Sequence, residues 1–184
     1  MHNTMSQTFM YKQFRIDKSG KLHPLFVFAG ETIETGKWLK AKDGPRTPDG
    51  KVASKLGKLA YRPGWHLSEL PYAPHIGIKE GGMIKYMHDD TVWALCEINA
   101  QNDYTSLAAQ NGMNGKKFNP RLAYLPYVPE AGFYWYTTNP NAQINWVITG
   151  EMRVIKVLSD TDCERICMRK AGIHAQPHRA QKGV

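Results

Sequence analysis

The residues best suited to chemistry are concentrated in residues 61–77, with the sequence YRPGWHLSELPYAPHIG. This segment contains Trp65, His66 and Tyr72, and its prolines and glycines, Gly64 among them, restrict the path of the backbone. Aromatic rings beside an imidazole can stack on a flat ring and form hydrogen bonds with it. The segment therefore indicates a wall that could hold a planar heterocycle. A structural role is the alternative, with Trp65 and Tyr72 in the core and His66 bonded internally.

A second aromatic group, Phe133 to Tyr136, precedes a run of Thr, Asn and Pro. In a strand, alternation places Phe133 and Trp135 on one face and Tyr134 and Tyr136 on the other. The group could line a pocket. It could equally form a strand with one face in the core and one face half-covered.

A third group has the ligand types of a zinc site: Cys163, Cys167, His174 and His178. The two cysteines lie one turn apart on an expected helix, but the gap to the histidines is much shorter than in an ordinary zinc finger. Cysteines at this spacing also suit the buried face of an amphipathic helix. We favour that structural role and assign no metal. Cys96 lies in a buried-looking strand and is expected to be inert.

The order of segments resembles the ADP-ribosyltransferase fold, in its poly-ADP-ribose-polymerase-like branch. The resemblance extends over roughly residues 22–158. It rests on Gly64-Trp65-His66-Leu67-Ser68-Glu69 followed by Tyr72-Ala73, on residues 92–98 (VWALCEI), and on residues 145–158 (NWVITGEMRVIKVL). It implies an α+β fold of split antiparallel β-sheets with few helices. It also implies a protein that binds NAD and transfers ADP-ribose to a macromolecular target.

The resemblance implies roles for individual residues. His66 falls on the tyrosine that stacks beside nicotinamide, and Asn145 falls on the catalytic glutamate. An asparagine can bond a ribose hydroxyl but cannot carry negative charge. Glu151 is the alternative carboxylate if the strand is bulged, and Gln143 is another polar candidate. The implied catalytic residues are His66, Asn145 and Glu151, and the implied NAD-binding residues are Gly64, Trp65, His66, Tyr72, Tyr134 and Tyr136.

The histidine of the family's first strand has no clean counterpart. His23 and Phe28 are the nearest residues, and neither is followed by glycine. Because Asn145 also departs from the family pattern, two interpretations stay open: an enzyme with altered chemistry, or an inactive binder on the same scaffold.

A looser resemblance links the chain to uncharacterised open reading frames of bacteria and their phages. It rests on the run from Lys55 to Leu70, which contains Lys-Leu-Gly, Arg-Pro-Gly-Trp-His and Leu-Pro. It suggests a protein encoded by a phage or mobile element. Its target would be a host protein or nucleic acid.

Positive charge is concentrated in one part of the chain. Lys and Arg total 24 against 16 Asp and Glu, a formal net charge of +8. The stretch from Lys37 to Arg62 holds eight basic residues, opposed only by Asp43 and Asp49. Its centre, residues 42–60, is expected to be a basic loop, and residues 159–184 a basic helix and tail. The alternative function is therefore a non-enzymatic module that engages nucleic acid or a host protein through this loop. A merely solvated loop is the third interpretation.

The elements that must position these residues form one expected domain, 1–184, of α+β class. We predict strands at 9–16, 22–29, 91–98, 133–138 and 145–158, the last with a bulge near Thr149-Gly150 or with both faces buried. We predict helices at 67–77 and 159–171, the second capped by Ser159 or Asp160 and ended by Gly172. Residues 43–58 and 110–132 are expected to be irregular. No apolar stretch is long enough to span a membrane and no signal peptide is visible, so we expect a cytoplasmic protein without membrane association.

Overall fold

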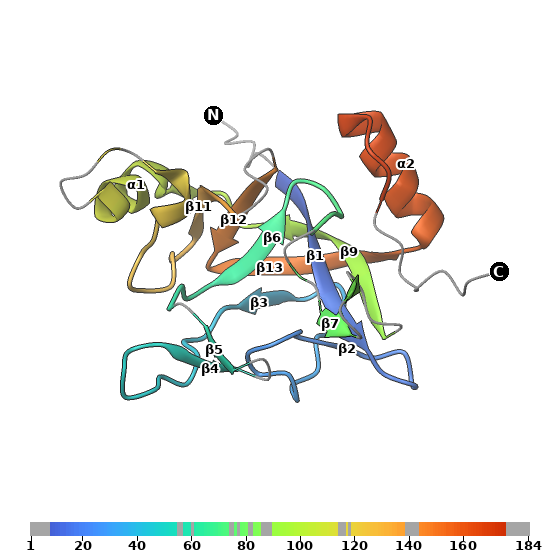
Figure 1. Ribbon diagram of the computed structural model, residues 1–184, viewed down its shortest axis with the longest axis horizontal. Coiled ribbons are helices and arrows are strands. Elements are labelled where there is room, and N and C mark those ends of the chain that lie inside the picture. The colour runs from blue at the N-terminus through green and yellow to red at the C-terminus, as the bar shows by residue number, and fades with distance from the viewer. Residues whose placement is uncertain are drawn as a thin grey trace.

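The computed structural model describes residues 8–54, 57–59, 61–73, 76, 78–80, 83–85, 90–113, 117, 119–138 and 144–175. These residues form a mixed α+β fold with one large, mostly antiparallel sheet and two α-helices (Figure 1). The predicted α+β class is therefore confirmed.

Within these residues, nine strands make up the large sheet, and two small hairpins lie outside it. The order across the sheet is β10-β11-β12-β6-β1-β9-β13-β3, with β2 paired to β1. The strands of the sheet are β1 (Thr8–Ile16), β2 (Leu22–His23), β3 (Trp38–Lys40), β6 (Trp65–Ser68), β9 (Thr91–Ile98), β10 (Asn102–Asp103), β11 (Gly132–Thr137), β12 (Asn145–Thr149) and β13 (Glu151–Leu158). The hairpins are β4 (Val52–Ser54) with β5 (Gly57–Leu59), and β7 (Ile78–Glu80) with β8 (Met83–Lys85). The helices are α1 (Thr105–Met113), α2 (Asp160–Ala171) and a short 3-10 turn, Pro120–Leu122.

The sheet consists of two halves that are joined weakly at β1. Strand β1 pairs with β9 at eight consecutive positions, but with β6 at a single pair, Tyr11 with Ser68. The same edge of β1 pairs with β2 at Arg15 and Ile16. Between these contacts, none of the described strands pairs with residues 12–14 of β1 on this edge. We call this place, where β6 and β2 diverge from β1, the fork.

The chain crosses between the halves a second time at Gly150. Strand β12 belongs to the half with β6 and β11, whereas β13 pairs with β9 and β3. Gly150 bridges both, because its N–H donates to Gly132 O at 3.1 Å and its carbonyl accepts from Ala41 N at 2.8 Å. The bulge predicted near Thr149-Gly150 is instead this crossing, and the register irregularity lies between Val154 and Lys156. The alternative expectation, burial of both faces, holds for residues 146–149.

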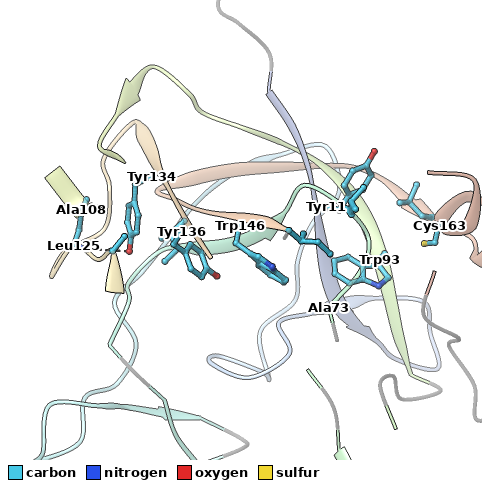
Figure 2. Packing of buried hydrophobic residues seen from close by; sticks show 14 residues of the cluster. Tyr11, Ala73, Trp93, Ala108, Leu125, Tyr134, Tyr136, Trp146 and Cys163 are labelled. Carbon is cyan, nitrogen blue, oxygen red and sulfur yellow. Dashed lines mark hydrogen bonds between the residues drawn. The ribbon is translucent and has the colours of Figure 1, made fainter. Parts of the chain in front are cut away.

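Both faces of the sheet carry a buried cluster. One cluster contains an aromatic row that runs through both halves (Figure 2): Tyr134, Tyr136, Trp146, Trp93 and Tyr11. Helices α1 and α2 cover this face through Ala108 and Cys163, near opposite ends of the sheet (Figure 1). The other cluster holds smaller aliphatic side chains, with Phe133 and Trp135 against it. The predicted alternation of residues 133–136 is confirmed.

Helix α2 follows the local signals of its sequence. Ser159 accepts from Asp162 N, and the Asp162 carboxylate accepts from Ser159 N, which completes a capping box. Gly172 ends the helix with φ 64°, a left-handed conformation that suits glycine. Cys163 and Cys167 face the core. The prediction for 159–171 is confirmed.

Two other predictions of local structure are wrong. Only Leu22–His23 of the predicted strand 22–29 is extended, and turns follow, with Phe28 at φ 54°. The segment predicted as a helix at 67–77 begins as strand β6, because Leu67 and Ser68 pair with β12. No helix is present among its described residues. The prolines of this segment oppose a helix, and the aromatic and branched residues around it favour a strand.

The mid-chain helix is α1 (Thr105–Met113), which overlaps the start of the stretch predicted as irregular. It buries only Ala108 and contains Gly112, so its sequence lacks a clear apolar stripe. A Cβ at Gly112 would lie 2.3 Å from Leu122 O, which shows how closely the backbone approaches α1 here. The predicted basic loop is also partly ordered, since its described residues include the β4–β5 hairpin.

Candidate functional site

His66 lies on β6, and the sheet places it beside Tyr136. His66 is opposite Ile148 of β12, and Tyr136 is opposite Trp146 of the same strand. The two rings meet edge-on with centroids 5.8 Å apart, and His66 Nδ1 lies 3.1 Å from the Tyr136 hydroxyl. His66 Nε2 lies 2.9 Å from the carbonyl oxygen of Arg62. Because a carbonyl only accepts, the neutral imidazole carries its proton on Nε2 and accepts from Tyr136 at Nδ1.

Tyr136 remains a protonated donor in this arrangement. Burial raises the pKa of Tyr136 well above its ordinary value, although the charge of Arg62 acts in the opposite direction. The Arg62 guanidinium lies 5.3 Å from the centre of the Tyr136 ring and donates to the carbonyl of Arg121. The site therefore combines an imidazole and a cation from residues 62–66 with a phenol from β11.

Lys12 is a functional candidate that sequence reasoning missed. It lies in the fork, and its Nζ donates to the carbonyl oxygen of His66 at 3.0 Å. The same Nζ lies 5.6 Å from the Phe14 ring centre and 5.7 Å from that of Trp65. Burial lowers the pKa of Lys12 to about 8. The sequence could have revealed it. In a strand, alternation places Lys12 on the same face as Met10 and Phe14, and a lysine on such an apolar face is unusual.

The remaining predicted NAD-binding residues make internal contacts. Gly64 has φ 133°, and a Cβ there would lie 2.4 Å from Ile148 Cγ2, so the backbone passes directly over β12. Trp65 faces the opposite side of β6 from His66, and its Nε1 donates to Leu39 O at 2.9 Å. Tyr134 is buried, and its hydroxyl accepts from Leu125 N at 3.4 Å. Tyr72 packs against the same cluster. Of this set, His66 and Tyr136 share a hydrogen bond, and Tyr72, Tyr134 and Tyr136 belong to one packed cluster.

Asn145 and Glu151 lie apart from His66. Asn145 precedes Ile148, the partner of His66, by three residues, or about 10 Å along the strand, and alternation turns it to the other face. Its backbone N and Nδ2 donate to the Glu69 carboxylate at 2.8 and 3.4 Å. Glu151 instead accepts from Asn99 Nδ2 at 3.0 Å. Gln143 lies outside the described residues.

The contact between Asn145 and Glu69 was not visible in the sequence. The residues are 76 positions apart, and only the pairing of β6 with β12 brings them together. The family resemblance expects a carboxylate at position 145, where this chain has asparagine. The carboxylate of Glu69 instead lies against that asparagine.

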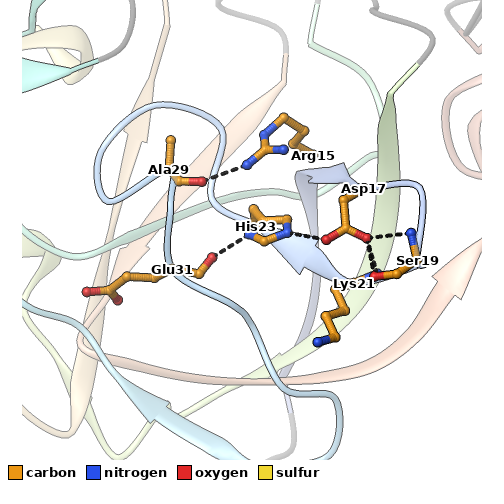
Figure 3. A network of polar contacts seen from close by, with 7 residues as sticks. All are labelled: Arg15, Asp17, Ser19, Lys21, His23, Ala29 and Glu31. Carbon is orange, nitrogen blue, oxygen red and sulfur yellow. Dashed lines mark hydrogen bonds and ion pairs between the residues drawn. The ribbon is translucent and has the colours of Figure 1, made fainter.

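His23, one of the two residues near the expected first-strand histidine, belongs to a polar network around a turn (Figure 3). His23 Nε2 lies 2.8 Å from Asp17 Oδ2, and Nδ1 lies 2.8 Å from Glu31 O. The other oxygen of Asp17 accepts from the backbone N of Ser19 at 2.8 Å and of Lys21 at 3.0 Å. Both ring nitrogens of His23 are therefore engaged in holding the turn. Phe28 is also engaged, under Lys42 Nζ at 5.4 Å.

This network predicts a stability contribution that is lost in acid. Hydrogen bonds from His23 first, and then from Ser19 and Lys21, hold the pKa of Asp17 well below its usual range. Since the folded-state pKa is depressed, the contribution is fully present above the unfolded pKa of about 4 and decreases as the pH falls toward the folded value. We expect Asp17→Asn to lower the unfolding free energy at neutral pH, with a difference from wild type that shrinks below about pH 4.

Urea unfolding of both proteins across that pH range measures this difference. The exposed Asp43→Asn variant controls for the loss of a surface carboxylate. A difference between wild type and Asp17→Asn that stays constant from neutral pH to pH 2 would contradict the role of Asp17.

The cysteine and histidine group has the features of a structural cluster. Cys163 and Cys167 are buried, and burial raises their pKa values to about 12 and about 11. His174 contacts Glu164, and His178 lies outside the described residues. In the described part of the chain, no three His, Cys, Asp or Glu side chains are grouped so that they could hold a metal ion.

The basic segment contains a stacked cation. The Arg46 guanidinium lies 3.8 Å above the centre of the Tyr61 ring. Two lysines of the region are paired with carboxylates, Lys37 with Glu34 and Lys42 with Glu31. Lys55 lies outside the described residues. Arg46 is thus held against an aromatic ring within the basic segment.

Comparison of the chain with protein-family models, with curated proteins and with solved structures found no match. Within the described residues, neither helix is both long and apolar enough to cross a bilayer.

Proposed function

We propose that this protein is a divergent, NAD-binding member of the ADP-ribosyltransferase-like class that transfers ADP-ribose to a macromolecular target. The observation that carries the proposal is the fork. Two antiparallel half-sheets meet there at one residue pair, and His66 lies on the strand that diverges. A split antiparallel sheet with a ring-binding residue at its opening is the arrangement that the family resemblance implies.

The side chains around His66 suit the nicotinamide ring and the pyrophosphate of NAD. His66 is half-buried and is held edge-on by Tyr136, so its ring has a fixed orientation for stacking on nicotinamide. Arg62 adds a cation beside these rings, which suits a pyrophosphate. Asn145 and its partner Glu69 lie on the other face of the strand from His66, so neither is assigned to the ribose next to nicotinamide.

The test is NAD binding and nicotinamide release by His66→Ala. Stacking on an aromatic ring contributes about 1–3 kcal/mol, so we expect NAD affinity to fall roughly 10- to 100-fold. His174→Ala is the matched control, because His174 is exposed and lies beyond α2. Titration calorimetry measures binding, and chromatography measures free nicotinamide. Unchanged NAD affinity in a folded His66→Ala protein would contradict the assignment.

The carboxylate is identified by the same release assay. With Glu69→Gln we expect both NAD affinity and nicotinamide release to be retained, because Glu69 lies with Asn145 on the other face from His66. Loss of release in Glu151→Gln would assign the catalytic role to Glu151, the residue implied by the family pattern.

A non-enzymatic binding module is the second candidate function. The stacked pair of Arg46 and Tyr61 favours it, because arginine on an aromatic ring within a basic segment suits contact with nucleic acid. Absence of NAD binding in the wild type, together with nucleic-acid binding that weakens steeply with salt, would support this candidate over the transferase.

A further inference from the structure

A strip of arginines and tyrosines runs from the basic segment to the turn at Pro120–Leu122 and beyond it. We propose that this strip binds a single strand of nucleic acid. Phosphates would lie against the guanidinium groups, and bases would stack on the rings. The six residues that we call the strip are Arg46, Tyr61, Arg62, Arg121, Tyr124 and Tyr127.

Direct contacts connect the three segments that supply the strip. The Arg46 guanidinium lies 3.8 Å from the centre of the Tyr61 ring. Arg62, the next residue, donates through its guanidinium to the carbonyl oxygen of Arg121. Figure 1 shows the β4–β5 hairpin of the basic segment on the same side of the molecule as helix α1, which bonds to the backbone N of Tyr124. The basic segment therefore lies beside the turn that follows α1, although 59 positions separate Arg62 from Arg121.

Residues 121–129 begin and end against residues 62–64. They begin at the hydrogen bond just described. They end at Pro129, whose Cδ would lie 3.5 Å from a Cβ at Gly64. The stretch between these two points is therefore held beside the basic segment. The tyrosines that it exposes, by 39% and 47%, are Tyr124 and Tyr127.

The charge around these tyrosines is positive. Residues 116–129 contain Lys116, Lys117 and Arg121 and no acidic residue. The stretch from Lys37 to Arg62 holds eight basic residues against two aspartates. This excess matches the phosphates of a nucleic acid. An acidic protein segment would match the charge as well, but it would leave the exposed rings unused, whereas bases stack on such rings.

The exposed rings favour a single strand over a duplex. In a duplex the bases are stacked on one another, so side chains do not reach their faces. In a single strand every base has an accessible face, and both tyrosine rings and guanidinium planes stack on it. Arg46 is exposed above Tyr61 and offers a guanidinium plane of this kind.

The strip adjoins the candidate NAD site at Arg62. The Arg62 carbonyl accepts from His66 Nε2 at 2.9 Å, and its guanidinium lies 5.3 Å from the centre of the Tyr136 ring. A strand on the strip would therefore pass beside His66 and be the macromolecular target, a role that rests on the proposed function. In the transfer, a nitrogen or hydroxyl oxygen of the strand bonds to C1 of the ribose while the bond from C1 to nicotinamide breaks. Nicotinamide leaves with the bonding electron pair, and the attacking group releases its proton to solvent.

The experiment measures, by fluorescence anisotropy and without NAD, how the full chain binds a labelled single-stranded DNA of about 12 nucleotides. Each stacked base that is lost predicts binding roughly 5- to 100-fold weaker, for Tyr124→Ala and for Tyr127→Ala. Arg121→Gln is expected to reduce the slope of log affinity against log salt by about 0.7. Arg62 is left unchanged because it also belongs to the candidate NAD site. An RNA of the same sequence identifies the kind of strand that is preferred.

Two matched variants change similar side chains elsewhere. Phe9→Ala removes a ring that is 43% exposed on β1, and Lys18→Gln removes an exposed charge in the turn after β1. Because salt screens exposed charges that lie farther apart than a Debye length, we expect both variants to bind within about twofold of the wild type. Circular dichroism establishes that every variant is folded before it is titrated.

The outcomes separate this proposal from the proposed function. Weaker binding by the tyrosine and arginine variants, with unchanged controls, supports the strip. Equal binding by all variants overturns it, and so does a duplex that binds as tightly as the single strand. Polyglutamate that displaces the strand as well as unlabelled DNA does would overturn it in favour of an acidic protein partner. Strand binding by a protein without affinity for NAD would support the strip and contradict only the transfer.

Discussion

A Gly150→Ala variant is expected to lose at least about 3 kcal/mol of stability, because the added methyl group meets backbone that cannot move. A Cβ at Gly150 would lie 2.1 Å from Pro129 O. Gly150 also bonds through both backbone groups, to Gly132 and to Ala41, on the two sides of the crossing between β12 and β13. Relief of the clash would have to break one of these contacts and separate the half-sheets.

Thermal and urea unfolding measure this effect. A loss of 3 kcal/mol corresponds to a fall in Tm of roughly 6–12 °C for a chain of this size. The matched control is Gly30→Ala, where a Cβ would meet nothing within 4 Å and the φ is not left-handed. That variant is expected to be neutral or slightly stabilising. Equal losses for the two variants would refute the close approach at Gly150.

An Arg153→Met variant is expected to cost about 3 kcal/mol, because it leaves a buried carboxylate without its partner. Arg153 pairs with Glu97 across β13 and β9, and the side chains are 33% and 7% exposed. The guanidinium also lies 5.1 Å from the centre of the Trp38 ring. Glu97 is the more deeply buried partner, so loss of the arginine matters more than loss of one surface charge.

A double-mutant cycle distinguishes the ion pair from simple packing. Adding Glu97→Met to Arg153→Met removes both charges, and we expect most of the stability to return. Lys37→Met is the matched control, since its pair with Glu34 is exposed and should contribute less than about 1 kcal/mol. Denaturant unfolding measures the wild type, the two single variants Arg153→Met and Glu97→Met, the double variant and the Lys37→Met control. A double variant that is less stable than Arg153→Met alone would contradict a charge-driven loss.

Much of the local structure was predictable from the sequence, because it depends on neighbours along the chain. The Ser159 cap, the acidic first turn and Gly172 define α2 within a few residues of each other. The alternation of residues 133–136 assigns each ring to a face of β11. The strand 91–98 is a run of branched and aromatic residues that favours a buried position in any sheet.

The errors occurred where tertiary contacts override local preference. Strand β6 was predicted as the start of a helix, and only its pairing with β12 and β1 makes it extended. Helix α1 has almost no apolar stripe and owes its place to contacts with the chain around Leu122 and Tyr124. Such contacts join residues that lie far apart in sequence, so no window of the sequence contains them.

The candidate site also has a part that the sequence predicts and a part that depends on tertiary contacts. The sequence by itself determined which residues have the required chemistry, above all His66, Tyr136 and Asn145, because residue type alone decides what can stack or form hydrogen bonds. Only the tertiary structure decided which of them meet. It joins His66 to Tyr136, gives Asn145 the carboxylate of Glu69, and places Lys12 in the fork. The physical reason is that strand register and the divergence of β6 from β1 set these distances, and both depend on pairing across the whole sheet.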